Sequence, residues 1–207
     1  MARDTGSIVK MSRREGYALH PKAHKALAKR SATPGQGNTG GRGGRNKPSQ
    51  YSLQLREKQK VKRLYGLLER QFAKLMSEAS RKQGQAGELL LQLLEQRADN
   101  AVYRAGLAPS RRAARQLVTH GHFMLNDRRV DIPSIRMSVG DVLTVRPRSL
   151  KTDYFKRIDD VSPAPATLPS WIKSDRKKLA ITITGVPARD EAEPDINEQL
   201  IVEYYSR

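Results

Sequence analysis

Three arginine side chains stand close together in the segment from Ser110 to His120. At 100° per residue, Arg111, Arg112 and Arg115 share one side of a helix, and the alanines, leucine and valine of the segment occupy the other side. Ser110 is a favourable N-cap, and the glycine after His120 is a favourable end. Guanidinium groups bind phosphate oxygens through paired hydrogen bonds, and helix N-terminal amides add partial positive charge. The segment therefore predicts a helix whose outer side binds phosphate.

A hairpin is predicted directly after this helix. Its apolar side chains are expected to share one face and are those of Phe123, Leu125, Val130 and Ile132. The turn falls at Asn126-Asp127, two residue types that tolerate positive φ. Arg128 and Arg129 follow at the tip, where they are placed to bind the same phosphate backbone as the helix.

Cationic groups on a rigid helix and a turn suit RNA better than DNA. A-form RNA hides its base edges in a narrow groove and is recognised by the spacing of its phosphates and 2′-hydroxyls. Charge alone leaves DNA open, but Gln116 is the one amide on this helix that is placed for base edges, so reading of the major groove is poorly supported. Aromatic residues make up only 5% of the chain, which leaves few platforms for base stacking.

The remaining polar residues form no recognisable catalytic or metal-binding set. His120 and His122 lack a third ligand, and no glutamate follows His20 to complete a metalloprotease motif with His24. The absence of cysteine excludes disulfides and thiolate zinc sites. We therefore predict no metal, no cofactor and no catalytic residue. His120 is interpreted as an RNA contact at the helix end, with an idle surface group as the alternative.

The charge of the whole chain agrees with a polyanionic partner. The 39 basic and 21 acidic residues give a formal net charge of +18. Residues 1–50 hold eleven basic and two acidic groups, whereas residues 187–207 hold two basic and six acidic groups. This gradient indicates a molecule with one face for a polyanion and one end turned away from it.

The length of 207 residues allows one or two domains. Because no stretch of about 18 apolar residues occurs, a transmembrane helix is not expected. The first residues lack the apolar core of a secretory leader, so a leader is not expected either.

The elements that position the arginines are mostly helical. From Leu53 to about Lys82 the apolar residues fall within an arc of roughly 120°, which predicts one helix. Four cations lie opposite and form an expected outward basic ridge, for which a merely solvated face is the alternative: Arg56, Arg63, Arg70 and Lys74. Residues 88–96 predict a leucine-rich core helix, and residues 97–106 predict a short helix.

The rest of the chain predicts smaller elements. We expect a third strand at residues 141–146, a polar helix at 151–160, a second hairpin from 171–172 and 179–184, and a helix or strand at 196–205. The glycine-rich run at 34–45 cannot bury enough apolar surface to order itself alone. We interpret it as part of an extended basic arm that threads between RNA helices, and a flexible linker is the alternative.

Several motifs resemble a known family. The segments Arg97–Gly106, Ser110–His122 and Leu125–Pro133 resemble the small RNA-binding module named after the fourth protein of the small ribosomal subunit, which some pseudouridine synthases and tyrosyl-tRNA synthetases also contain. Outside the module, the resemblance to the bacterial or organellar ribosomal protein family is carried by Ser12–Gly16, Pro34–Gln36, Gln54–Gly66, Glu69–Phe72 and Ile196–Arg207.

The resemblance implies an α+β fold. A mostly helical domain, at 51–96 and 187–207, would hold an inserted RNA-binding module at 97–186, in which two helices pack on a short antiparallel sheet. Residues 1–50 would form a basic, glycine-rich extension. Zinc-binding members carry cysteines where this chain has Val9 and Ser12, so a zinc-free form is expected.

The resemblance also implies a non-enzymatic, cytoplasmic or organellar ribosomal protein. Such a protein binds a multi-helix junction of small-subunit ribosomal RNA, nucleates assembly of the subunit body and supports accurate translation. It lies beside the fifth and third small-subunit proteins, near the channel through which mRNA enters, and can repress its own message. The alternatives are an RNA-modifying enzyme, for which the chain lacks a catalytic domain, and a nonspecific basic RNA chaperone.

Site residues follow from both arguments. The contacts that the resemblance carries over to this chain fall at Arg13, Arg14, Arg56, Lys58, Lys60, Arg63, Arg104, Ser110, Arg111, Arg115, Gln116 and His120. The expected geometry of the helix and the hairpin adds Arg112 and Arg128.

Overall fold

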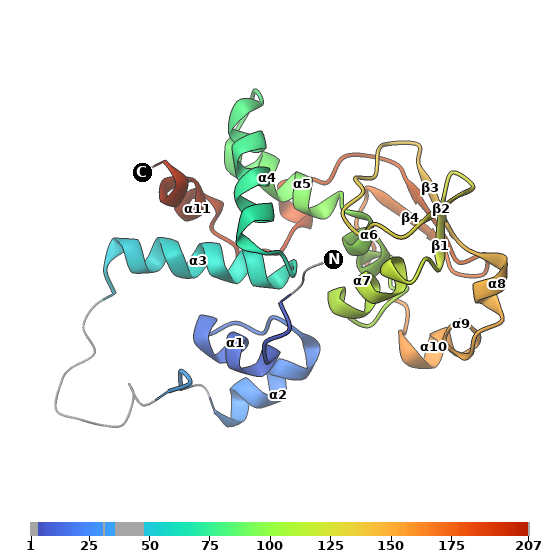
Figure 1. Cartoon of the computed structure of the whole chain (residues 1–207), viewed down its shortest axis with the longest axis horizontal. Coiled ribbons are helices and arrows are strands. Elements are labelled where there is room, and N and C mark those ends of the chain that lie inside the picture. Colours follow the sequence, from blue (N-terminus) through green and yellow to red (C-terminus); the bar gives the residue numbers. More distant parts are fainter. Residues whose placement is uncertain (1–3, 31, 36–47, 207) are drawn as a thin grey trace. The chain divides into compact units, whose positions relative to one another are not determined.

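The computed structural model describes residues 4–30, 32–35 and 48–206 and divides into two compact units (Figure 1). Unit 1 is formed by Met1–Gly87 and Asp195–Arg207, and unit 2 is formed by Glu88–Pro194. The boundaries therefore fall at 87/88 and 194/195, whereas the sequence suggests 96/97 and 186/187. The first boundary lies within a single helix, α5 (Ala86–Glu95), rather than at its end.

Unit 1 is helical in its described residues. Its elements are α1 (Ile8–Glu15), α2 (Pro21–Lys29), α3 (Gln50–Leu64), α4 (Glu69–Arg81) and the C-terminal α11 (Glu198–Tyr205). The helix α11 packs along α3, and α1 packs against α2 and α3. Buried apolar side chains of these helices include those of Ala23, Val61, Phe72, Met76 and Ile201.

Two of these helices lie in the segment for which the sequence predicts an extended arm, and this part of the prediction is wrong. Gly16 ends α1 in the left-handed conformation, with φ 64°. The ring of His20 accepts a hydrogen bond from the Lys22 amide and caps α2, whose first residue is Pro21. The charge and the glycine content of this segment suggested an extended arm, but local capping residues make part of it helical. The glycine-rich run from residue 36 onward lies outside the described residues.

The single helix predicted over residues 53–82 is two helices. Gly66 adopts φ 66°, and the Leu67 amide donates to the Lys62 carbonyl at 2.9 Å, so α3 ends in a left-handed glycine cap. The chain then restarts at Glu69. The periodicity of the apolar residues continues across the break, which is why the pattern alone predicts one element.

Unit 2 contains an antiparallel sheet with the strand order β2-β1-β3-β5-β4. The strands are β1 (Phe123–Leu125), β2 (Arg128–Val130), β3 (Val142–Val145), β4 (Ile172–Asp175) and β5 (Ala180–Ile183). The register pairs Phe123 with Val145 and Leu143 with Ile181. The second predicted hairpin, β4–β5, is present. It joins the first one because β3 pairs with both β1 and β5.

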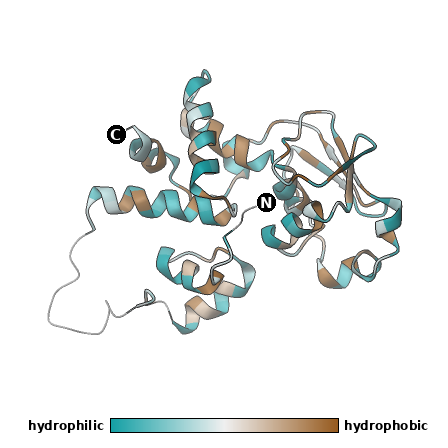
Figure 2. Ribbon diagram, in the orientation of Figure 1, coloured by the Kyte–Doolittle hydropathy of each residue, from teal (hydrophilic) through white to brown (hydrophobic). Residues whose placement is uncertain are grey.

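Short helices surround this sheet. They are α6 (Ala98–Arg104), α7 (Arg111–Thr119), α8 (Pro147–Leu150), α9 (Asp153–Lys156), α10 (Ile158–Val161) and a 3-10 turn at Arg189–Glu191. The prediction of one polar helix over 151–160 is thus replaced by two short helices, α9 and α10. The hydropathy colours alternate along α6 and α7, as expected for helices that bury one side (Figure 2).

The core of unit 2 lies between α6, α7 and the sheet. Val102 and Val118 of the helices share one buried cluster with Phe123, Leu143 and Ile181 of the strands. Burial of side chains of this size contributes about 1.5–3 kcal/mol each. Ile132 was expected on the same inward face but is 48% exposed, because it lies beyond the last residue of β2. The α+β prediction is confirmed.

None of the helices that the structure describes is long and apolar enough to span a membrane. Within the same residues, no group of three or more histidine, aspartate or glutamate side chains is arranged to hold a metal ion.

Candidate RNA-binding surface

The helix α7 is held firmly at both ends. The Ser110 hydroxyl accepts a hydrogen bond from the Ala113 amide at 3.2 Å, as an N-cap does. Gly121 takes φ 69° and follows the helix end. Ala114 and Val118 are fully buried and anchor the inner side. The predicted element from Ser110 to His120 is confirmed, and its outer side is fixed in direction.

The outer side of α7 presents only some of the predicted groups to solvent. Arg112, Gln116 and His120 are exposed along the helix. Arg128, on β2, is exposed as well. The turn before β2 is the predicted one: Asn126 and Asp127 have φ values of 47° and 64°. These four polar groups are exposed on the surface of unit 2.

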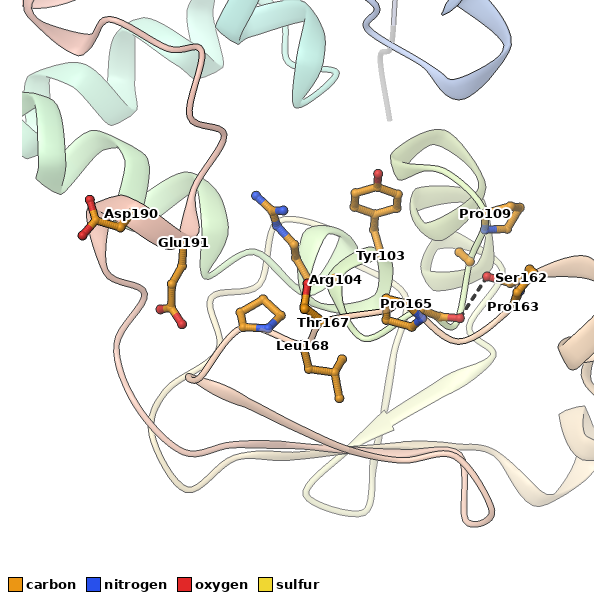
Figure 3. Close-up of a pocket in the computed structure, with 13 residues that line it drawn as sticks. Tyr103, Arg104, Pro109, Ser162, Pro163, Pro165, Thr167, Leu168, Asp190 and Glu191 are labelled. Atoms are coloured by element: carbon orange, nitrogen blue, oxygen red, sulfur yellow. Dashed lines mark hydrogen bonds between the residues drawn. The ribbon is translucent and has the colours of Figure 1, made fainter.

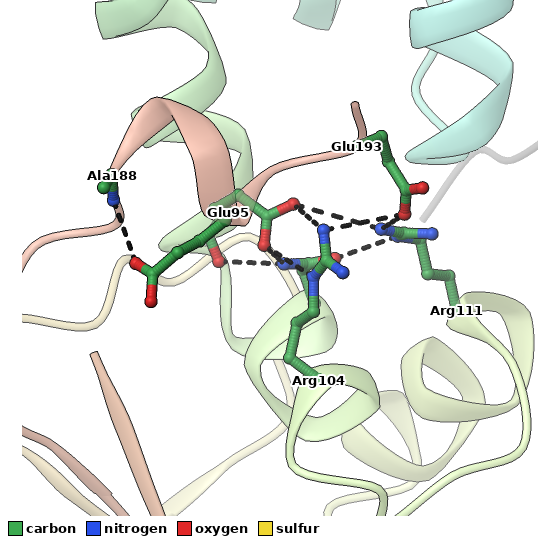
Figure 4. A network of polar contacts seen from close by, with 7 residues as sticks. Glu95, Arg104, Arg111, Ala188 and Glu193 are labelled. Carbon is green, nitrogen blue, oxygen red and sulfur yellow. Dashed lines mark hydrogen bonds and ion pairs between the residues drawn. The ribbon is translucent and has the colours of Figure 1, made fainter. Parts of the chain in front are cut away.

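The other arginines of this region are held by carboxylates within unit 2 (Figure 4). Arg104 donates from Nε and Nη2 to the carboxylate of Glu95, at 2.9 and 2.8 Å. Arg111 donates from Nε to the Asn100 side chain at 2.9 Å and from Nη2 to Glu193 at 2.8 Å. The side chain of Glu95 is only 1% exposed, and that of Arg111 is 14% exposed. Both arginines therefore form a partly buried polar network rather than an open cationic face.

Arg115 is drawn toward a second buried carboxylate. Asp99 accepts two hydrogen bonds from Arg97, at 3.0 and 2.7 Å, and the Nη1 atom of Arg115 lies 3.8 Å from the same carboxylate. The Asp99 and Arg97 side chains are both buried. Of the three arginines predicted on one side of α7, Arg112 is thus the exposed one. Arg111 lies close to the carboxylate of Glu193, and Arg115 lies close to that of Asp99.

The predicted contacts of unit 1 are likewise engaged in the folded chain. Arg56 and Arg63 of α3 both reach the buried carboxylate of Glu15, with Arg56 Nη1 at 3.3 Å. Burial raises the pKa of Glu15, although the charges of Arg56 and Arg63 act in the opposite direction. The predicted outward ridge is therefore wrong for α3, because an acid from another helix meets these arginines. Arg70 and Lys74 remain exposed on α4.

The lysines of α3 are also paired. Lys58 is buried, lies 2.8 Å from Glu69 and stands over the ring of Tyr204 at 4.5 Å. Burial alone would raise the pKa of Glu69, but hydrogen bonds from Lys58, Lys62 and Tyr205 lower it to about 2. The ammonium of Lys60 lies 2.8 Å from Glu57. These contacts assign a structural role to Lys58.

The two N-terminal arginines of the predicted set behave differently. Arg13 donates to the Ala32 carbonyl at 2.9 Å, whereas Arg14 is exposed at the end of α1. Among the predicted residues, the exposed ones are therefore Arg14, Arg112, Gln116, His120 and Arg128.

A pocket of about 590 Å³ lies in unit 2, between α6 and the proline-rich segment before β4 (Figure 3). Its lining combines Tyr103 and Arg104 with prolines and with the acids Asp190 and Glu191. The hydroxyl of Ser162 donates to the Gly106 carbonyl at 2.9 Å and so stabilises the end of α6. With this serine committed to the backbone and no histidine in the lining, the pocket offers no activated nucleophile.

Sequence reasoning missed Arg146 and the acids that hold the arginines. Arg146 follows β3 and donates to the Gly121 carbonyl at 3.0 Å. Glu95, Asp99 and Glu193 are ordinary acids in the sequence, and their pairing depends on contacts between separate elements. Only the unusual burial of a charge could have singled them out, and burial is not visible in a spacing pattern.

Comparisons with known proteins agree with this architecture. Residues 3–95 match the family described as "Ribosomal protein S4/S9 N-terminal domain", and residues 96–143 match the "S4 domain". A protein of Chloroflexus aurantiacus, named "Small ribosomal subunit protein uS4", is 48% identical over the full length of both chains. Proteins of the same name from Clostridioides difficile and Pelodictyon phaeoclathratiforme are 47% and 49% identical, also over both full lengths.

The fold, the capped arginine helix and the family matches define an S4-domain protein. The chain belongs to the uS4 family of small ribosomal subunit proteins. The resemblance drawn from the motifs is confirmed, and so is the expectation of a protein that is not an enzyme, because the members of this family are ribosomal proteins.

Proposed function

We propose that this chain binds folded small-subunit ribosomal RNA at a junction of several RNA helices. The observation that carries the proposal is the outer side of α7, where Arg112 and Gln116 are exposed on a helix fixed by its Ser110 cap and its buried inner side. The planar fork of a guanidinium is preorganised, so it loses less conformational freedom per hydrogen bond when it binds a phosphate. The helix is therefore suited to read the shape of an RNA backbone.

The charge distribution supports the same partner. The chain carries a net charge of +18 and few aromatic residues, which favours phosphate contacts over base stacking. The exposed arginines lie in both units, with Arg14 on α1 and Arg112 on α7. A junction, in which several RNA helices meet, offers phosphates to several separate cationic groups.

The role in the ribosome is proposed from the family. We place the chain in the cytoplasm, within the body of the small subunit, where it nucleates assembly. Its neighbours are the fifth and third small-subunit proteins and the mRNA close to the channel through which it enters. The chain supports accurate translation there and represses translation of its own message.

The experiment that tests RNA binding is a filter assay with the full-length chain and small-subunit ribosomal RNA at several salt concentrations. Replacement of Arg112 by Ala is expected to weaken binding about tenfold and to reduce the salt slope by about one unit. The variant Arg157→Ala is a matched control, because Arg157 is 72% exposed and lies in unit 2 outside α7.

Specificity separates this function from a nonspecific chaperone. A junction binder keeps a large preference for its own RNA at about 200 mM salt, whereas a nonspecific binder loses most of its affinity. Equal binding to small-subunit ribosomal RNA and to an unrelated RNA of the same length would overturn the proposal. Chemical footprinting of the complex would identify the junction.

A further inference from the structure

Two guanidinium groups from different strands meet at Gly121, the residue that follows the end of α7. Arg146 comes directly after β3, and its Nη1 atom donates to the Gly121 carbonyl at 3.0 Å. Its backbone amide donates to the His122 carbonyl at 2.9 Å, which holds the residue in place. Arg129, on β2, holds its guanidinium where a side chain at position 121 would stand. A β-carbon at position 121 would stand 2.7 Å from Arg129 Nε and 2.9 Å from its Nη2.

The absence of a side chain at position 121 makes this approach possible. Gly121 has φ 69°, a conformation that other residues adopt at a cost, and it leaves the space that the Arg129 guanidinium occupies. The two arginines are 17 residues apart in the sequence, yet both lie against one residue. His120, whose ring is exposed, is the neighbour on the helix side.

These two guanidinium groups differ from the others near α7 in their charge balance. Arg104, Arg111 and Arg115 each lie within 4 Å of a carboxylate. Within the described part of the chain, neither Arg129 nor Arg146 has an ion pair with an acid. The Gly121 carbonyl takes one N–H of Arg146, and a guanidinium carries five. Two positive charges therefore lie against one residue, Gly121, with most of their donors unused.

The excess positive charge affects the neighbouring residue His122. His122, next in the chain, lies with Nδ1 3.0 Å from the Ser149 hydroxyl. Burial lowers the pKa of His122, and the positive charges of His120 and Arg146 lower it further. The region thus favours an anion and disfavours an additional proton.

We propose that Arg129 and Arg146 together bind one phosphate group of the RNA at the C-terminal end of α7. This inference rests on the proposed function and deepens it by naming a phosphate site that combines Arg129, expected from the sequence to bind phosphate, with Arg146, which the sequence did not single out. Guanidinium groups bind phosphate oxygens in pairs of parallel hydrogen bonds, and Gly121, which has no side chain, lets both guanidinium groups lie close to it. The nine residues of α7 span about 14 Å, so contacts at Arg112 and at this site fix two separate points of the backbone.

The test is a double-mutant cycle with the full-length chain and small-subunit ribosomal RNA. Arg129→Gln and Arg146→Gln are each expected to weaken binding about tenfold and to reduce the salt slope by about one unit. If both arginines share one phosphate, the double variant is expected to lose little more than either single variant. The matched control Arg157→Gln, the same change on an exposed arginine of unit 2, is expected to leave affinity and slope unchanged.

A second measurement does not depend on RNA. Inorganic phosphate added to the labelled full-length chain is expected to shift the Nε resonances of Arg129 and Arg146 with one common midpoint, and to leave that of Arg157 unmoved. Gly121→Ala is expected to abolish the shift at Arg129, because the new methyl group takes its place. The variant Arg146→Lys, which keeps the charge but lacks the fork, is expected to recover only part of the binding.

The outcomes separate the two proposals. Unmoved Nε resonances, or slopes that fall by two units in the double variant, overturn the shared site even when the chain still prefers its RNA. Loss of that preference in the unchanged chain, with the phosphate shifts intact, overturns the proposed function and leaves the phosphate site standing. Thermal unfolding of each variant shows whether a loss of binding follows from a loss of folding.

Discussion

The Oε1 atom of Glu193 lies 2.8 Å from Arg111 Nη2, so a carboxylate of unit 2 holds an arginine that the family resemblance assigns to RNA. One face of this guanidinium lies 4.6 Å from the centre of the Tyr103 ring. An RNA phosphate that binds Arg111 therefore competes with Glu193 for this guanidinium. Glu193 therefore lowers the affinity of Arg111 for phosphate.

Removal of the charge at Glu193 is expected to strengthen RNA binding. In Glu193→Gln the side chain keeps its shape but no longer competes as an anion, so affinity is expected to rise about threefold to tenfold at low salt. Filter binding across a salt series measures the change. Glu198→Gln is a control with the same change of charge on α11 of unit 1. An equal gain in that control would show that net charge alone, and not the contact with Arg111, is responsible.

Glu95 is expected to matter for stability. Its buried carboxylate accepts hydrogen bonds from Asn100 and Arg104, and Glu95→Ala would remove the acceptor of two Arg104 hydrogen bonds, although Glu193 stays 3.5 Å from Arg104 Nη2. Loss of one member of a buried pair costs about 3–5 kcal/mol. Urea unfolding followed by circular dichroism measures the loss. Glu95→Gln, which retains one acceptor oxygen, is expected to lose less, and equal losses would contradict the role assigned to the charge.

Gly66 is expected to tolerate only residues that accept the left-handed conformation. Its φ of 66° ends α3, so Gly66→Ala is expected to destabilise the chain by about 1–2 kcal/mol. Asparagine adopts this conformation more readily, so Gly66→Asn is expected to cost less. Thermal unfolding of the two variants provides the comparison. If Gly66→Asn loses as much stability as Gly66→Ala, the left-handed backbone conformation is not the cause of the loss.

The stability of unit 2 is expected to fall as the pH falls below about 6.5. Burial, together with the charges of His120 and Arg146, lowers the pKa of His122 in the folded chain, so the unfolded chain takes up the proton first. As the pH falls, the loss of stability begins near the ordinary histidine pKa and ends near the lower pKa that His122 has in the folded chain. In His122→Gln this dependence is expected to disappear, whereas in the exposed control His24→Gln it is expected to persist. Urea midpoints between pH 7.5 and 5 give the answer.

Local features of the sequence predict local structure well. The Ser110 cap, the two-sided pattern of α7 and the turn at Asn126-Asp127 all follow from short-range chemistry, and the structure confirms them. The break at Gly66 was missed because the apolar periodicity continues across it. The single sheet was missed because the pairing of β3 with β5 joins residues about 40 positions apart.

The candidate site was harder to predict than the elements that hold it. Spacing places Arg111 and Arg112 on one side of α7, but only Arg112 is exposed there, and the acid that meets Arg111 comes from residue 193, far along the chain. The same holds for Glu15, which lies 48 positions before Arg63. A cationic residue that has no acid near it in the sequence can therefore still be paired with an acid in the folded chain. Exposure, which depends on the whole chain, decides which cations can reach a ligand.

The division of unit 1 between the two ends of the chain has a consequence for biosynthesis. Residues 88–194 form a contiguous unit and can fold as soon as they have been synthesised. The helix α3, by contrast, has α1 as a neighbour but lacks α11, and with it the hydrogen bond from Gln54 to Glu203, until the end of the chain has been synthesised. During synthesis, each chain therefore passes through a stage in which unit 2 can be folded and unit 1 is incomplete. In this stage proteases or chaperones can reach the side of α3 that α11 later covers.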